Sequence, residues 1–246
     1  MHLLSNLLLF ILTVVGGGLP LWFKGLTERR LQLLLAFSGA FLLSITFLHL
    51  LPETFQDQGA KTGFYILGGF FLQLFIQRIT HGVEHGHVHV TPGEHEHHHI
   101  PVLSIIVGLS VHAFMEGLPL GFNYRHEATG TSLYLAVAAH KLPEAMLLTM
   151  LVLANKGRGA AITTLIIFSL LTPFAAFIAT YLGTNYGAMS RMVAALIPIV
   201  AGAFIHISTT IFFESGTKQH SLTWQKVLVM AIGVSLALTT LLFEHS

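Results

Sequence analysis

Two histidine–glutamate pairs stand out in the middle of the sequence. His112 and Glu116 are four residues apart, and so are His140 and Glu144. In a helix, positions i and i+4 lie one turn apart on the same face. Two such faces turned toward each other would present two imidazoles and two carboxylates, which are donors that suit a divalent transition metal. The spacing therefore predicts a metal site between two helices.

The segments around both pairs are apolar, and the whole composition is that of a membrane protein. Of the 246 residues, 53% are hydrophobic and only 9% are charged, whereas a soluble domain carries about 25% charged residues. The chain has no cysteine, which excludes disulfides and thiolate ligands, and its net charge of +1 gives no basic surface for nucleic acid. We expect an all-α, polytopic integral membrane protein in contact with a lipid bilayer.

Runs of roughly 20 apolar residues predict eight transmembrane helices. They cover approximately residues 3–23, 31–51, 63–80, 100–123, 131–154, 160–182, 189–212 and 224–243. No connection is long enough for a separate soluble domain, so we expect residues 1–246 to form a single transmembrane domain. The connections after the odd-numbered spans hold eight lysines and arginines, and the other connections hold three. This asymmetry predicts that both termini lie outside the cytoplasm, and we expect the plasma (inner) membrane.

The two pairs lie near the middle of the fourth and fifth predicted spans. A charge at that depth costs at least about 2.5 kcal/mol, and a bound divalent cation would offset both carboxylates. Pro119 and Pro143 lie close to the two glutamates, and each is expected to remove a backbone hydrogen bond and kink its helix. The alternative is that each histidine and glutamate form only a structural hydrogen bond.

The connection between the third and fourth spans is rich in histidine. Residues 81–99 contain eight of them: His81, His85, His87, His89, His95, His97, His98 and His99. The segment has no apolar face, so we expect a disordered cytoplasmic loop. It could bind metal weakly, for buffering or sensing, or it could be a tolerated polar linker.

A short internal sequence repeat, which we call the internal echo, is shared by the second and seventh spans. Gly39-Ala-Phe41 recurs as Gly202-Ala-Phe204. An even and an odd span run in opposite directions, so the echo predicts an inverted repeat around spans four and five, as in many secondary transporters.

Three further polar residues are candidates for the ion pathway. His49 and Glu53 lie at the outer end of the second span. They could gather ions at an entrance, or they could be ordinary interfacial residues. His206, in the seventh span, is either a satisfied core histidine or a secondary ligand along the exit route.

These motifs resemble the ZIP family of divalent transition-metal transporters over nearly the whole chain. The fourth span reads H-x-x-x-E-G-x-x-x-G, the fifth reads H-x-x-P-E, and the second ends in H-L-L-P-E. The resemblance implies a 3+2+3 helix bundle and import of zinc, iron or manganese into the cytoplasm. It also implies a transport site made by His112, Glu116, His140 and Glu144.

The sequence departs from the family pattern at a second, adjacent metal position. Where many members have an Asn, an acid or amide, and a Glu before a proline, this chain has Ala113, Lys141 and Thr172. We therefore expect one metal, with the Lys141 ammonium occupying part of the space and charge of the second. The alternative is that Lys141 faces another direction and contacts backbone carbonyls.

Our functional prediction is a transporter and not an enzyme. The transported substrate would be Zn²⁺ or another divalent transition metal such as Fe²⁺, Mn²⁺, Co²⁺ or Cd²⁺, because affinity order alone does not select among them. The alternatives are an intramembrane metal-dependent hydrolase, although the sequence lacks H-E-x-x-H, and metal efflux by the same site. The expected partners are divalent metal ions and the bilayer, with a possible homodimer and no nucleic acid.

Overall fold

The computed structural model describes residues 2–23, 26–80, 102–122, 124, 127–185, 187–214 and 223–242, and all the regular secondary structure in these residues is helical. A helix satisfies its own backbone hydrogen bonds, which is what a lipid environment requires. The elements are α1 (His2–Gly17), the 3-10 turn η1 (Leu19–Leu21), α2 (Glu28–Ile45), the π-helical turn η2 (Thr46–Leu50), α3 (Leu51–Gln58), α4 (Lys61–Thr80), α5 (Val102–Leu120), α6 (Glu127–Asn185), α7 (Gly187–Glu214) and α8 (Trp224–Leu242).

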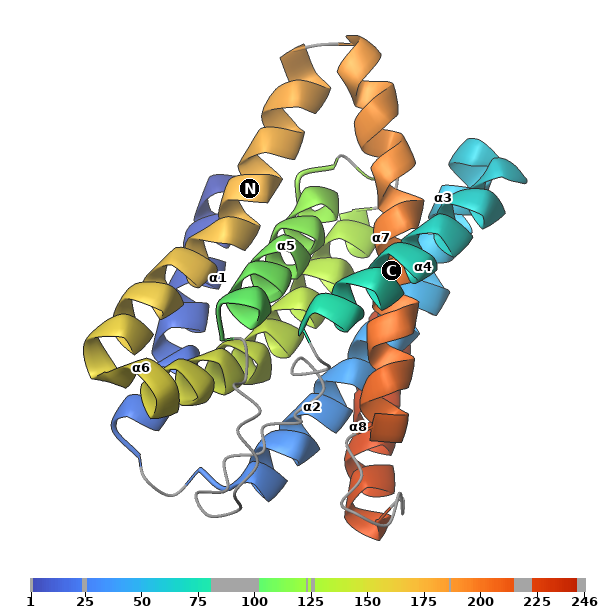
Figure 1. The fold of residues 1–246 in the computed structure, drawn as a ribbon. Helices are drawn as coiled ribbons and strands as arrows, with labels where there is room; N and C mark the ends of the chain where they lie inside the picture. Colours follow the sequence, from blue (N-terminus) through green and yellow to red (C-terminus); the bar gives the residue numbers. More distant parts are fainter. Residues whose placement is uncertain are drawn as a thin grey trace.

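Helix α6 consists of two helices joined at Gly157. This residue has φ 83° and ψ 176° and carries the non-helical backbone inside α6. Glycine lacks a Cβ and adopts positive φ at little cost, so the chain reverses there (Figure 1). We call residues 127–156 the first arm of α6 and residues 158–185 the second arm. Helicity continues through Pro143 in the first arm and Pro173 in the second.

Six helical segments of the described residues are long and apolar enough to cross a membrane. They are Leu4–Leu21, Arg29–Gln58, Val102–Leu120, Thr129–Gly183, Ala194–Phe212 and Trp224–Leu242. The fourth of these contains both arms of α6, and α4 is not among the six. The predicted spans therefore coincide with helices, while the count of eight crossings stays a prediction.

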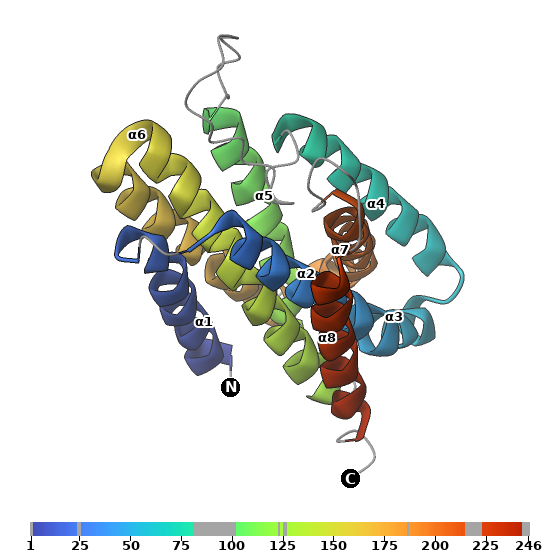
Figure 2. The ribbon, with the colours of Figure 1, turned by 90° about the horizontal axis from the view of Figure 1, so that it is seen from below.

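Helix α5 lies in the middle of the bundle and packs against α6 (Figures 1 and 2). Gly117 and Gly121 allow a close approach to the second arm, because a Cβ at either position would overlap the carbonyl oxygen of Thr172 or Ala176. Thr172 Oγ1 also donates a hydrogen bond to the Ala113 carbonyl oxygen at 2.8 Å. These contacts fix the height of α5 relative to α6.

Two apolar clusters flank the predicted metal ligands. The turn-side cluster, on the side of Gly157, lies mainly before His112 on α5 and after Glu144 on α6. It includes Leu35, Ile105, Leu109, Leu148, Leu151, Ile207 and Ile211. The far-side cluster lies before His140 on α6; it includes Leu50, Leu133, Val137, Phe204 and Ala237. The middle of the bundle is thus covered by apolar side chains at both ends.

The second predicted span forms one long helical stretch from α2 through η2 to α3. The π-helical turn at Thr46–Leu50 immediately precedes Pro52 at the start of α3. Such turns are rare and often occur at functional sites. This turn carries His49, one of the predicted pathway residues.

Candidate metal site

The α5 pair forms a direct contact in the centre of the bundle. His112 Nε2 lies 3.1 Å from Glu116 Oε1, and both side chains are buried. The four-residue spacing places them on the same face of the helix, as the sequence predicts. That face is turned toward the first arm of α6.

The α6 pair completes the cluster from the opposite side. His112 Nε2 is 3.6 Å from Glu144 Oε1, and His140 Nε2 is 3.8 Å from Glu116 Oε1. The two imidazole rings are nearly perpendicular, with centroids 6.1 Å apart. One nitrogen or oxygen from each of the four residues lies within 4.8 Å of the others.

These separations fit the coordination sphere of a small divalent metal. Bonds of 2.0–2.2 Å to nitrogen and oxygen in a tetrahedron place neighbouring donors roughly 3.3–3.6 Å apart. The three separations of 3.1, 3.6 and 3.8 Å are close to that range. His112 Nδ1 and Glu144 Oε1 are buried and have no hydrogen-bond partner among the described residues, which is uncommon for buried polar atoms. The arrangement can hold one ion after a small contraction.

The Lys141 side chain points into the same cluster. Its ammonium forms an ion pair with Glu116 Oε2 and lies 2.7 Å from Glu144 Oε2. It also lies 4.7 Å from the centre of the Phe168 ring, on the second arm. Of the two predicted orientations for Lys141, this geometry favours the one directed at the carboxylates. A buried cation thus already neutralises part of the carboxylate charge.

Outside the four predicted ligands, Ser38 on α2 contacts the cluster. Its Oγ lies 3.4 Å from His140 Nδ1, so it can hold the ring with Nε2 directed at the site. Nothing in the sequence singles out Ser38, apart from its position next to Gly39 in the internal echo. Phe168, the ring that Lys141 covers, was not predicted either, because a single phenylalanine among 19 carries no signal.

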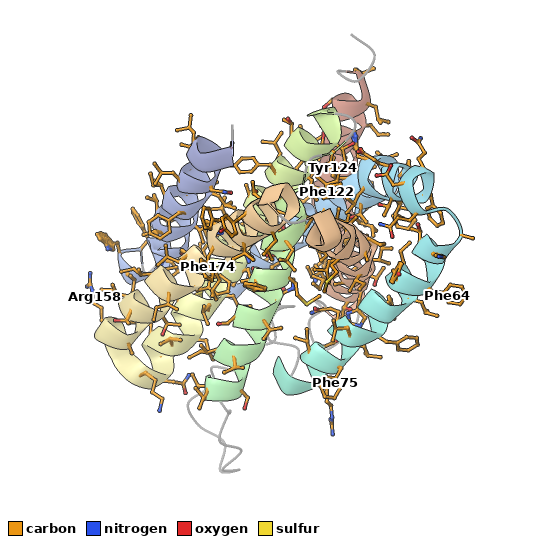
Figure 3. All side chains as sticks on the ribbon, turned by 90° about the horizontal axis from the view of Figure 1, so that it is seen from above. Phe64, Phe75, Phe122, Tyr124, Arg158 and Phe174 are labelled. Carbon is orange, nitrogen blue, oxygen red and sulfur yellow. The ribbon has the colours of Figure 1, made fainter. Side chains whose placement is uncertain are left out.

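Two predicted pathway residues, His49 and Glu53, lie beside Leu50 and Leu51 of the far-side cluster. His49 Nε2 is 2.7 Å from Thr240 Oγ1 on α8, and both His49 and Glu53 are buried. Glu53 borders a small hollow that Tyr124 also lines. Burial, and then the proximity of the Glu53 carboxylate, raises the pKa of the Tyr124 phenol well above its usual value. Figure 3 shows Tyr124 beside Phe122, with ring centroids 5.3 Å apart.

His206, on α7, is also separate from the cluster. Its ring packs edge-on against Phe70 of α4 at 4.8 Å, and Thr210 Oγ1 lies 3.5 Å from Nδ1. These contacts are those of a packed core histidine. The histidine-rich segment at 81–99 lies outside the described residues.

The sequence matches a known protein family over most of its length. The family is described as ZIP zinc transporter, and the matches cover residues 1–104 and 89–240. They span both motifs and all the helices described above except the last two residues of α8, and the central His/Glu cluster is consistent with handling a divalent metal. The chain belongs to the ZIP zinc transporter family, whose members are integral membrane proteins that transport divalent metal ions.

Proposed function

We propose that this protein imports Zn²⁺ into the cytoplasm through a single intramembrane site. The ligands of the transported ion would be His112, Glu116, His140 and Glu144. The observation that carries the proposal is the convergence of four buried donors, from α5 and the first arm of α6, to within 4.8 Å of one another. Nitrogen and oxygen donors of this kind suit zinc and also accept iron(II), manganese(II), cobalt or cadmium.

The position of the site between two apolar clusters supports alternating access. In this structure the four ligands are at most 2% exposed, so an ion between them would be closed off from both sides. Release toward either side requires the turn-side or the far-side cluster to separate. Rocking of helix groups around a fixed central site would do this, as in other secondary transporters.

The first test is zinc flux in proteoliposomes. A His112→Ala, Glu144→Ala double variant should lose saturable uptake, because it removes one ligand from each helix. Ser169→Ala is a matched control, since it removes a buried hydrogen bond, 2.7 Å to the Leu165 carbonyl oxygen, without touching the cluster. Wild-type-like flux in the double variant would remove these residues from the mechanism. Competition with Fe²⁺, Mn²⁺, Co²⁺ and Cd²⁺ in the same assay would establish the ion preference.

The direction of transport needs a cellular measurement. Overexpression of an importer should raise cellular zinc, and the double variant should not. A fall in cellular zinc would instead indicate efflux through the same site.

We further propose that Lys141 replaces a second metal ion. Its ammonium pairs with one oxygen of each carboxylate, where a bridging cation would otherwise be attracted. With residues 81–99 deleted, to remove the histidine-rich segment, the purified protein should bind one zinc ion per chain. Two tightly bound ions in that protein would contradict the single-site proposal.

The proposed topology has eight crossings in a 3+2+3 bundle, with both termini outside the cytoplasm. The chain has no cysteine, so an introduced cysteine can be labelled selectively. We expect Gln56→Cys, on α3, to react with an impermeant maleimide in intact cells. Lys156→Cys, beside the α6 turn, should react only after permeabilisation. The reverse pattern would invert the topology.

The remaining candidates have supporting roles in this proposal. His49 and Glu53 would attract ions at an outer entrance, and His206 would be a packing residue or a secondary ligand on the exit route. The histidines of 81–99 would bind metal weakly in the cytoplasm. Alanine variants of His49, Glu53 and His206 should reduce zinc uptake less than variants of the four ligands. An equal loss of uptake would place the residue concerned in the transport site.

A further inference from the structure

A cleft lies between α1 and the second arm of α6, away from the metal site. Its volume is about 450 Å³. Of the eleven described residues that line it, ten are apolar or glycine and none is acidic. The lining consists of Val14, Val15, Gly18, Leu19, Leu21, Trp22, Phe23, Arg158, Ile162, Leu165 and Ile166. We call it the α1–α6 groove.

One end of the groove has the composition of a membrane interface. Trp22 and Phe23 are 67% and 64% exposed there, and tryptophan is enriched at the level of lipid headgroups. The Arg158 guanidinium lies 6.0 Å from the Trp22 ring. It comes directly after the Gly157 turn and projects from the edge of the bundle (Figure 3). Among the described residues of the lining, the single charged one is therefore at the polar end of the groove.

From this end the groove extends into the apolar part of the bundle. Its lining on the second arm runs from Arg158 to Ile166, eight residues that rise about 12 Å. The facing residues belong to a membrane-capable segment, Leu4–Leu21, and to the second arm within Thr129–Gly183. In a bilayer such a wall is covered by hydrocarbon, because no water is present to fill it.

We propose that the α1–α6 groove binds an anionic phospholipid, with one acyl chain along the groove and the phosphate on Arg158. Charge complementarity selects this occupant. A planar guanidinium pairs with two phosphate oxygens at once, and Lys156 adds a second exposed cation two residues away. Basic pockets between transmembrane helices on the cytoplasmic side bind anionic lipid headgroups in this way.

The groove borders the turn-side cluster that covers the transport site, and Leu19 and Leu21 of its lining pack against that cluster. Leu165 lines the groove and also belongs to the turn-side cluster, together with Ala145, which directly follows Glu144. A lipid held here would support the packing of α1 on α6 near one ligand. The binding itself does not depend on which ion is transported.

Trp22 is a built-in reporter, because the chain has only two tryptophans. In a Trp224→Phe variant, fluorescence comes from Trp22 alone, and brominated lipids quench it on contact. Vesicles would contain phosphatidylcholine and phosphatidylglycerol, with one or the other brominated. One arginine near the headgroups should favour the anionic lipid about five-fold. The preference should disappear in Arg158→Gln and weaken in high salt.

Two controls separate a specific site from ordinary lipid contact. In a Trp22→Phe variant, fluorescence comes from Trp224 alone. Any preference of the anionic lipid for quenching Trp224 should stay the same when Arg158→Gln is added. Ile166→Phe, which adds volume inside the groove, should reduce quenching of Trp22 by the anionic lipid, whereas Ile167→Phe, outside the lining, should not. Equal quenching of Trp22 by both lipids would overturn the proposal, as would an anionic preference that survives Arg158→Gln.

Discussion

The two His/Glu motifs have the same residues at the same spacing, yet their contacts differ. On α5 the motif closes on itself, with His112 Nε2 3.1 Å from Glu116 Oε1. On α6 the partners lie elsewhere. His140 is directed at Ser38 and at Glu116, and Glu144 pairs with Lys141 and approaches His112.

Lys141 accounts for the contact of Glu144 within its own helix. It lies three residues before Glu144, on the same helix face, and pairs with one of its oxygens, and it also pairs with Glu116 Oε2 across the helix interface. The equivalent position on α5 is Ala113, which offers the cluster no polar side chain. Spacing therefore sets which helix face a residue occupies, but a charged side chain within the motif, such as Lys141, influences which partner the glutamate contacts. Both motifs belong to one network, in which only the α5 motif also has a direct contact between its own histidine and glutamate.

Lys141→Met should have the largest effect on stability. It keeps most of the apolar stem but removes the cation between two buried carboxylates, and breaking a buried ion pair costs about 3–5 kcal/mol. We expect the unfolding free energy of metal-free protein in detergent to fall by about that amount, with partial recovery when zinc is added. Lys156→Met, at an exposed position of the same helix, should leave it unchanged. An unchanged unfolding free energy in Lys141→Met would mean that Lys141 does not hold the network together.

Glu116→Gln should weaken zinc binding more than Glu144→Gln. The Glu116 carboxylate contacts His112, His140 and Lys141, so it is the point that joins the two motifs. We expect zinc affinity, measured by competition with a chelator, to fall about 100-fold or more for Glu116→Gln, because even residues outside the ligand shell contribute 10–100-fold. A larger loss in Glu144→Gln would reverse the ranking of the two motifs.

Much of the fold follows from the sequence, because the bilayer restricts the chain to helices. Each predicted span coincides with a helix, and the predicted break between residues 154 and 160 falls at Gly157. The residues at which the helices end were less predictable. The second span continues through η2 into α3, past the point where the apolar pattern alone suggests an end, and a π-helical turn lies directly before α3 and its Pro52.

The site was predictable where its residues recur within one helix. Both His/Glu pairs follow from i,i+4 spacing, and the close approach of α5 to its neighbour follows from Gly117 and Gly121. Contacts between helices distant in sequence could not be derived. Ser38 reaches His140 across 102 positions of the chain, and no local pattern encodes which side chains meet over such a separation.

Ser38→Ala tests whether the α6 motif depends on help from outside the motif. Loss of a partner that orients a metal-binding histidine lowers affinity 10–100-fold, and the long 3.4 Å contact places our expectation near 10-fold. Ser44→Ala on the same helix is the matched control, since Ser44 bonds to its own helix at the Ala40 carbonyl oxygen. Equal zinc affinities in the two variants would show that His140 is oriented without Ser38.

Thr172→Val should have the smallest effect of these variants, and it tests whether the α5 motif depends on a contact from the second arm of α6. Thr172 is at the position where many ZIP members have a metal-binding glutamate, but here its hydroxyl donates to the Ala113 carbonyl oxygen on α5. Because its donor is engaged in helix packing, we expect a loss of about 0.6 kcal/mol in unfolding free energy and no change in zinc affinity. Thr180→Val, which removes a similar bond to the Gly121 carbonyl oxygen, should behave alike. A ten-fold fall in zinc affinity confined to Thr172→Val would instead place this hydroxyl in the coordination of the ion, and the α5 motif would then depend on the second arm as the α6 motif depends on Ser38.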